Sequence, residues 1–167
     1  MLALQLPSTA CGTVDLSALG QPRTVLYCYP RTGVPGQPLP TGWDAIPGAR
    51  GCTPQSCAFR DHHAELQALG TDVYGLSTQT AAYQREMAQR LHLPFAVLSD
   101  ADLALANALM LPTFEVDGMR LIKRLTLIVE AGRIAGVLYP VFPPDRSAEA
   151  VIDWLRQHPI GAPSRGH

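Results

Sequence analysis

Two cysteines five positions apart are the residues in this sequence best suited to chemistry. Cys52 follows a stretch crowded with glycine and proline, and Thr53-Pro54 directly after it opens a segment with helical periodicity. A thiol in the first turn of a helix lies beside unpaired backbone N–H groups and the positive end of the helix dipole, and both favour a thiolate. Cys52 is therefore a candidate nucleophile. A small buried apolar role for a cysteine fits the same position equally well.

The spacing of Cys57 from Cys52 predicts motion. Five residues of an α-helix span about 7.5 Å along the axis with a rotation of about 140°, whereas a disulfide needs Cα atoms about 4.4 to 6.8 Å apart. The two sulfurs cannot bond while the helix is intact. If Cys52 is oxidised to a sulfenic acid, the first turns must unwind before Cys57 can condense with it. Pro54 and the glycines before Cys52 make this end of the helix easy to open.

A zinc site made of Cys52, Cys57, His62 and His63 is one alternative. Two cysteines on one helix, with adjacent histidines that point about 100° apart, do not form a tetrahedral cage, and structural zinc sites favour two separated chain segments. A solvated helix face is the better interpretation of the histidines. We expect no metal and no other cofactor.

A disulfide oxidoreductase, or a redox-sensing protein without peroxidase turnover, is the second alternative. Such oxidoreductases usually carry Cys-x-x-Cys, which this sequence lacks, whereas Cys-x4-Cys suits a cycle through a sulfenic acid. The two remaining cysteines, Cys11 and Cys28, receive no catalytic role, although Cys11 could serve as an alternative resolving thiol. Cys28 lies in an apolar run and is expected to pack in a sheet.

The elements that position these residues alternate along the chain. Buried strands are predicted at 24–29, 72–77 and 95–98, and helices at about 53–69 and 80–91. This order implies parallel pairing through crossover connections. A short helix at 102–108, an antiparallel hairpin of strands 121–130 and 134–139, and a last helix capped by Ser147 complete the pattern. The pattern predicts an α/β fold with a central mixed β-sheet flanked by helices.

The composition predicts one soluble globular domain over residues 1–167. Hydrophobic residues make up 47% of the chain, charged residues 16%, and the formal net charge is -1. Without a block of like charge, neither nucleic acid nor an acidic membrane surface is an expected partner. The longest apolar runs, such as 125–129, are far shorter than the roughly 20 residues that span a bilayer. The N-terminus resembles no secretory or lipoprotein leader, so a cytoplasmic location is expected.

The chain resembles the peroxiredoxin Q subfamily of peroxiredoxins, also called bacterioferritin comigratory protein. The resemblance rests on Gly-Cys-Thr-Pro-Gln-Ser-Cys-Ala-Phe-Arg-Asp at 51–61, preceded by Val-Leu-Tyr-Cys-Tyr-Pro at 25–30 and followed by Val-Tyr-Gly-Leu-Ser at 73–77. It extends to 98–102, to 123–129 and to the final helix with Trp154, so that it covers nearly the whole chain.

The resemblance implies a thioredoxin-like fold and the reduction of hydrogen peroxide or organic hydroperoxides. Cys52 would be the peroxidatic cysteine and Cys57 the resolving one, with thioredoxin or a similar dithiol protein as the reductant. It also assigns Arg124 to the active-site arginine of the family. A permanent cation beside Cys52 would hold the thiolate and polarise the peroxide oxygen that leaves. The alternative for Arg124 is a surface charge near the start of a strand. A monomer or weak homodimer is the expected oligomeric state.

The sequence departs from the family before Cys52. Peroxiredoxins carry Pro-x-x-x-Thr/Ser-x-x-Cys, but Ala49 stands three positions before Cys52 and has no hydroxyl. Tyr-Pro-Arg-Thr at 29–32 resembles the start of this motif, so roughly fifteen residues, including 39–47, are expected to be inserted within 31–51. We expect Pro30 to shield the site and Thr32 to fold back and supply the hydroxyl.

Two other residues of the insertion are candidates for a role. Arg50, beside the cysteine, is a possible extra cation. Trp43 lies in the middle of the insertion and could form a lid or a partner surface, although pinning the loop to the core is the simpler role for it.

Overall fold

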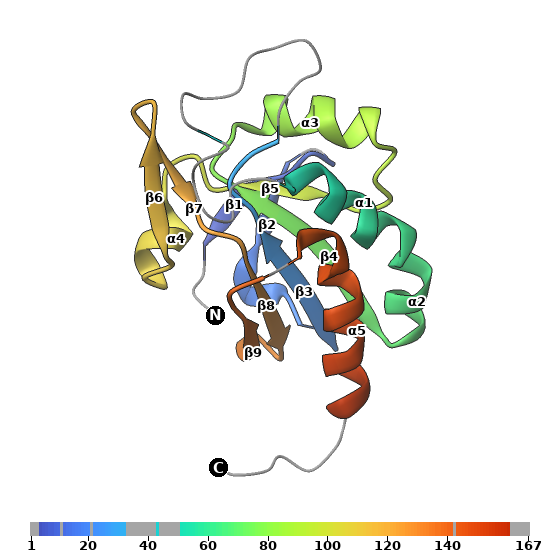
Figure 1. Ribbon diagram of the computed structural model, residues 1–167. Helices are drawn as coiled ribbons and strands as arrows, with labels where there is room; N and C mark the ends of the chain where they lie inside the picture. Colours follow the sequence, from blue (N-terminus) through green and yellow to red (C-terminus); the bar gives the residue numbers. More distant parts are fainter. Residues whose placement is uncertain are drawn as a thin grey trace.

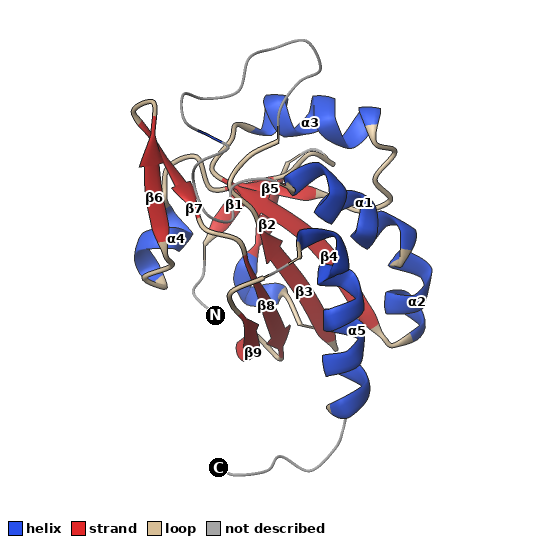
Figure 2. Cartoon of the chain, in the orientation of Figure 1, coloured by secondary structure: helices blue, strands red, loops and turns tan. Residues whose placement is uncertain are grey.

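The structure is a computed structural model that describes residues 4–10, 12–20, 22–32, 43, 51–141 and 143–160. Its centre is a five-stranded sheet with the strand order β5-β4-β3-β8-β9 (Figures 1 and 2). The strands are β3 (Arg23–Cys28), β4 (Thr71–Ser77), β5 (Val97–Ser99), β8 (Leu125–Glu130) and β9 (Arg133–Leu138). β3, β4 and β5 are parallel, whereas β8 and β9 run antiparallel to their neighbours. The predicted mixed sheet is confirmed.

Every residue of the central strand β3 is buried, because helices or loops cover both faces of the sheet. Val25 and Tyr27 point into one apolar cluster with residues of α1 and α5. Leu26 and Cys28 alternate with them and point into a second cluster on the opposite face. The helices are α1 (Cys52–Asp61), α2 (His63–Ala68), α3 (Ala81–Arg90), α4 (Ala104–Ala108) and α5 (Ser147–Gln157), with 3-10 turns η1 (Leu16–Ala18) and η3 (Pro144–Arg146).

Two small antiparallel pairs lie outside the central sheet, and neither was predicted. β1 (Gln5–Pro7) pairs with β2 (Thr13–Asp15), and β6 (Thr113–Val116) pairs with β7 (Met119–Ile122). The β6–β7 turn is Asp117-Gly118, with both residues at positive φ (48° and 74°). This dipeptide is a strong hairpin signal, since a tight two-residue turn needs positive φ at both central positions.

Three features of the elements correct the sequence-based expectation, apart from shifts of one or two residues at other ends. The helix predicted at 53–69 is two helices that meet at His62. The His62 ring Nδ1 lies 2.9 Å from the Ala58 carbonyl oxygen, and the His62 backbone N–H donates to the same oxygen. The strand predicted at 121–130 is divided at Lys123 and Arg124 into β7 and β8, because the Lys123 N–H bonds the Pro112 carbonyl instead of a strand partner.

The third correction concerns Ser147, which is not the cap of the last helix. The turn η3 leads directly into α5, so Ser147 already has helical backbone angles and Arg146 occupies the cap position. Among the described residues, no helix is long and apolar enough to cross a membrane. The insertion predicted within 31–51 lies outside the described residues except for Arg31, Thr32, Trp43 and Gly51, and it stays a prediction.

Candidate active site

Cys52 is the first residue of α1. This helix begins near the C-terminal ends of the parallel strands (Figure 1). The Cys52 side chain is buried, with 4% of its surface exposed. Gly51 before it has φ of 101°, and a Cβ there would lie 2.6 Å from the Pro144 side chain. A glycine is therefore required for the chain to enter the helix at this point. The predicted location of Cys52 at a helix start is confirmed.

Arg124 reaches Cys52 from the connection between β7 and β8. Its Nη2 donates to the Cys52 sulfur at 3.2 Å, and its guanidinium is buried at 4% exposure. A permanent cation at this distance interacts favourably with negative charge that develops on reacting atoms at the sulfur. Arg124 is therefore a buried group of the site, and the alternative of a surface charge is wrong.

Gln55 and Ser147 hold the arginine, and the sequence-based prediction missed both. Arg124 Nη1 donates to Gln55 Oε1 at 2.5 Å, and Gln55 Nε2 donates to the Ser147 hydroxyl at 3.3 Å. All three side chains are buried. The signal for Gln55 was present in the sequence, because a residue three positions after Cys52 lies on the same side of the helix. No local pattern indicated Ser147, which is 92 positions further along the chain.

Cys57 lies near the middle of α1 and is half-buried. Cys52 and Cys57 lie on one continuous helix, and no disulfide joins the two residues. Next to Cys57, the Ser56 hydroxyl accepts a hydrogen bond of 3.0 Å from the Tyr27 hydroxyl. The Phe59 ring stacks on Tyr27 with 4.4 Å between the ring centroids. These contacts stabilise the helical conformation of the segment that is predicted to unwind before the two sulfurs can bond.

Pro30 and Thr32 follow β3 and are both buried. The Thr32 backbone N–H donates to Gln79 Oε1 at 3.1 Å, and Gln79 Nε2 donates back to the Thr32 carbonyl at 3.0 Å. The Thr32 hydroxyl lies 3.5 Å from the same Oε1. Gln79 therefore fixes the backbone of Thr32. The roles expected for Pro30 and Thr32 at Cys52 stay predictions.

Three other residues discussed above lie outside the described part of the chain: Cys11, Ala49 and Arg50. Trp43 is described, and it is buried at 6% exposure in a cluster with Val116 and Leu121 of the β6–β7 hairpin. This contact supports a pinning role for Trp43.

The phenols of Tyr27 and Tyr29 and the thiol of Cys28 keep their protons at neutral pH. Burial raises the pKa of Tyr27 well above its usual range and raises the pKa of Tyr29 as well. Burial also raises the pKa of Cys28, which lies within β3. Cys28 is therefore a poor nucleophile, in agreement with the absence of a predicted role for it.

The two histidines considered as metal ligands are occupied in other ways. The His63 ring lies 5.7 Å from the Phe95 ring, and burial lowers the pKa of His63. Within the residues that the structure describes, no group of three or more His, Cys, Asp or Glu side chains could hold a metal ion.

Comparisons with known proteins find relatives over most of the chain. The model of the Redoxin family matches residues 2–152. Peroxiredoxin Bcp from Escherichia coli strain K12 is 28% identical over 162 residues, which are 92% of this chain and 90% of that protein. A chloroplastic peroxiredoxin Q from Triticum aestivum is 36% identical over 88 residues, 53% of this chain, and the match spans 34% of the wheat protein.

Solved structures share the fold. The crystal structure of peroxidoxin BcpB from Mycobacterium tuberculosis has a TM-score of 0.75 at 25% identity and covers 93% of this chain and 92% of its own. A Xanthomonas campestris bacterioferritin comigratory protein, described for its alkyl peroxide reduction activity, has a TM-score of 0.74 at 21% identity and covers 93% of this chain and 91% of its own. The predicted thioredoxin-like fold is confirmed.

Proposed function

The chain belongs to the Redoxin family, and from this membership we propose that it is a thiol-dependent peroxidase of the peroxiredoxin Q and Bcp kind. The observation that carries the proposal is the contact of 3.2 Å between Arg124 Nη2 and the Cys52 sulfur inside a buried site. A thiolate held by a guanidinium at a helix start is the group that peroxide reduction requires.

The first chemical step is attack of the Cys52 thiolate on the terminal oxygen of a hydroperoxide. A sulfur–oxygen bond forms, the oxygen–oxygen bond breaks, and the leaving oxygen takes a proton and departs as water or an alcohol. Cys52 becomes a sulfenic acid. Arg124 stabilises the negative charge that develops on the leaving oxygen, and Gln55 keeps the guanidinium in place.

The second step is condensation of the Cys52 sulfenic acid with the Cys57 thiol, which forms an intramolecular disulfide and releases water. It needs the first turns of α1 to unwind, since both residues lie on that helix. Unwinding separates Gln55 from Arg124 and from Ser147, and Ser56 from Tyr27. The contacts around the Cys52 sulfur are therefore lost while the disulfide forms, and they form again when the disulfide is reduced.

The proposal includes the substrates and partners of the cycle. Hydrogen peroxide and organic hydroperoxides are the substrates, and the Xanthomonas relative described for alkyl peroxide reduction supports the second class. Thioredoxin or a similar dithiol protein returns the two electrons. A reducing compartment such as the cytoplasm suits the cycle, because a dithiol donor is kept reduced there. A monomer or weak homodimer contains the whole cycle within one chain.

Turnover measured with reduced thioredoxin tests this function. The wild-type protein should consume peroxide and thioredoxin in equal amounts, and Cys52→Ser should be inactive. Cys57→Ser should consume one equivalent of peroxide and then fail to recycle. Cys28→Ala is the matched control and should keep its activity. Absence of turnover in the wild-type protein, or full turnover in Cys52→Ser, would favour a disulfide oxidoreductase or a sensor instead.

A further inference from the structure

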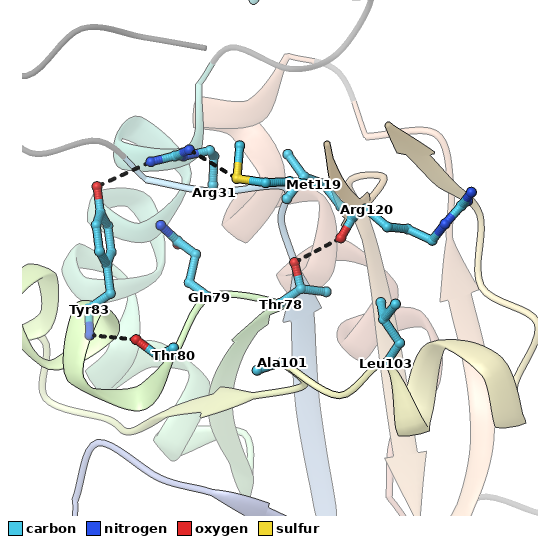
Figure 3. A pocket seen from close by; sticks show the side chains of 10 residues that line it. Arg31, Thr78, Gln79, Thr80, Tyr83, Ala101, Leu103, Met119 and Arg120 are labelled. Carbon is cyan, nitrogen blue, oxygen red and sulfur yellow. Dashed lines mark hydrogen bonds between the residues drawn. The ribbon is translucent and has the colours of Figure 1, made fainter. Parts of the chain in front are cut away.

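A cavity of about 420 Å³ lies apart from Cys52, between the start of α3 and the β6–β7 hairpin (Figure 3). Its walls include Arg31, Gln79, Tyr83, Leu103, Met119 and Leu121, whereas Cys52 and Arg124 do not line it. The volume falls in the range of about 300 to 1,000 Å³ that is usual for small-molecule sites. The reaction proposed above makes no use of this cavity.

Arg31 is one of two arginines among the described residues that line the cavity. Its Nη2 donates to the Tyr83 hydroxyl at 3.3 Å, and its Nη1 contacts the Met119 sulfur at 3.6 Å (Figure 3). The guanidinium also lies over the Tyr83 ring, 5.8 Å from its centroid. Both partners are neutral, and among the described residues no carboxylate forms an ion pair with Arg31. A half-buried cation with neutral partners is stabilised by any anion that reaches it.

Arg120 provides the contrast within the same cavity wall. Its side chain extends away from Arg31 (Figure 3), and its guanidinium is paired with Glu115 at 2.6 Å and with the Thr113 hydroxyl at 2.7 Å. The charge of Arg120 is therefore already compensated on the outer side of the hairpin. Of the two arginines, Arg31 is the one that pairs with no carboxylate of the described residues.

The rest of the lining suits a negatively charged ligand with an apolar body. Among the described residues, no aspartate or glutamate lines the cavity, while Ala101, Leu103, Met119 and Leu121 supply apolar surface. The first turn of α3 also borders it, with the Thr80 hydroxyl capping the Tyr83 N–H. The positive end of this helix adds to the potential that Arg31 creates.

We propose that this cavity is a binding site for a small monocarboxylate, whose carboxylate pairs with Arg31 and whose compact apolar part packs on Leu103, Met119 and Leu121. One guanidinium matches one negative charge. A doubly charged phosphate would leave a second charge without compensation beside apolar side chains, which is costly. The inference goes beyond the peroxidase reaction and does not depend on it.

Titration of the reduced, nitrogen-15-labelled protein with benzoate tests this site by nuclear magnetic resonance. Benzamide is the matched probe, because it has nearly the same shape and no charge. Benzoate should give saturable shifts at cavity amides such as those of Tyr83 and Leu121, and benzamide should bind at least about 10-fold more weakly, as expected for loss of a charge-assisted pair.

Arg31→Gln should weaken benzoate binding by a similar factor, whereas the matched variant Arg120→Gln should leave it nearly unchanged. Ala101→Trp, which fills the cavity from an exposed position, should also abolish binding and gives an independent test if Arg31→Gln fails to fold. The proposal is overturned if benzoate produces no saturable shifts, if benzamide binds equally well, or if folded Arg31→Gln binds like the wild-type protein. Loss of peroxidase activity alone would leave these results unaffected.

Discussion

Replacement of Ser56 by alanine should accelerate the second chemical step while leaving the first unchanged. In the closed helix, Ser56 accepts a hydrogen bond of 3.0 Å from the fully buried Tyr27 hydroxyl. Ser56→Ala leaves that hydroxyl buried without this partner, which costs about 1 to 3 kcal/mol. The open helix has already lost the contact and can hydrate the phenol, so it escapes most of this cost.

The closed form is therefore destabilised relative to the open form, and the opening equilibrium should rise by about 5- to 150-fold. Where opening limits resolution, the Cys52–Cys57 disulfide should form faster by up to this factor. Rapid quenching of the protein after one equivalent of peroxide, followed by mass spectrometry of the sulfenic acid and the disulfide, measures both steps. The free energy of unfolding of Ser56→Ala should be lower than that of the wild-type protein by about 1 to 3 kcal/mol.

A double variant supplies the control for this prediction. Tyr27→Phe combined with Ser56→Ala removes both partners and leaves no orphaned hydroxyl, so the resolution rate should return toward that of the wild-type protein. The reasoning is refuted if Ser56→Ala resolves no faster than the wild-type protein although its stability has fallen. It is also refuted if the double variant stays as fast as Ser56→Ala.

The remaining predictions concern the Cys52 thiolate, the Thr32 hydroxyl and the buried Cys28 thiol. Arg124→Gln should slow oxidation of Cys52 by about 10²- to 10³-fold, the usual cost of losing one preorganised donor. Lys123 is the exposed neighbour of Arg124, and Lys123→Gln should oxidise at the wild-type rate in stopped-flow measurements. Equal rates for the two variants would contradict the role of Arg124. Thr32→Val should slow the same step and Thr32→Ser should not, and identical rates for the two would remove Thr32 from the site. Burial raises the pKa of Cys28 above its unfolded value, so above about pH 8.5 the unfolded chain releases a proton that the folded chain keeps. Stability should therefore fall as pH rises from there, by up to about 1.4 kcal/mol per pH unit. Urea unfolding of Cys28→Ala should show a smaller loss between about pH 8.5 and 10, and an unchanged slope would exclude Cys28 as its source.

The parts of the fold that follow from local pattern could be predicted from the sequence. β3 and β4 are apolar, β-branched runs ended by turn residues, and they form the buried parallel centre of the sheet. Cys52 at a helix start follows from the glycine before it and the proline soon after it. The contact of Arg124 with Cys52 did not follow from any local pattern, because 72 positions separate the two residues. It came from the family resemblance.

The parts that sequence reasoning missed depend on tertiary contacts. The segment 121–130 was predicted as one strand although Lys123 and Arg124 interrupt its apolar residues, and the local pattern did not show that the chain leaves the sheet there and then resumes as β8. Ser147 has the residue type of a helix cap, but its hydroxyl accepts from Gln55 instead. The Asp117-Gly118 turn was a local signal that was overlooked, and it marks the hairpin that forms one wall of the Arg31 cavity.

Mass mapping of the protein after one equivalent of peroxide tests the central claim most directly. The account predicts a single new disulfide between Cys52 and Cys57, and in Cys57→Ser a sulfenic acid on Cys52. A disulfide that joins Cys52 to Cys11 or Cys28, or oxidation that leaves Cys52 as a thiol, would contradict it.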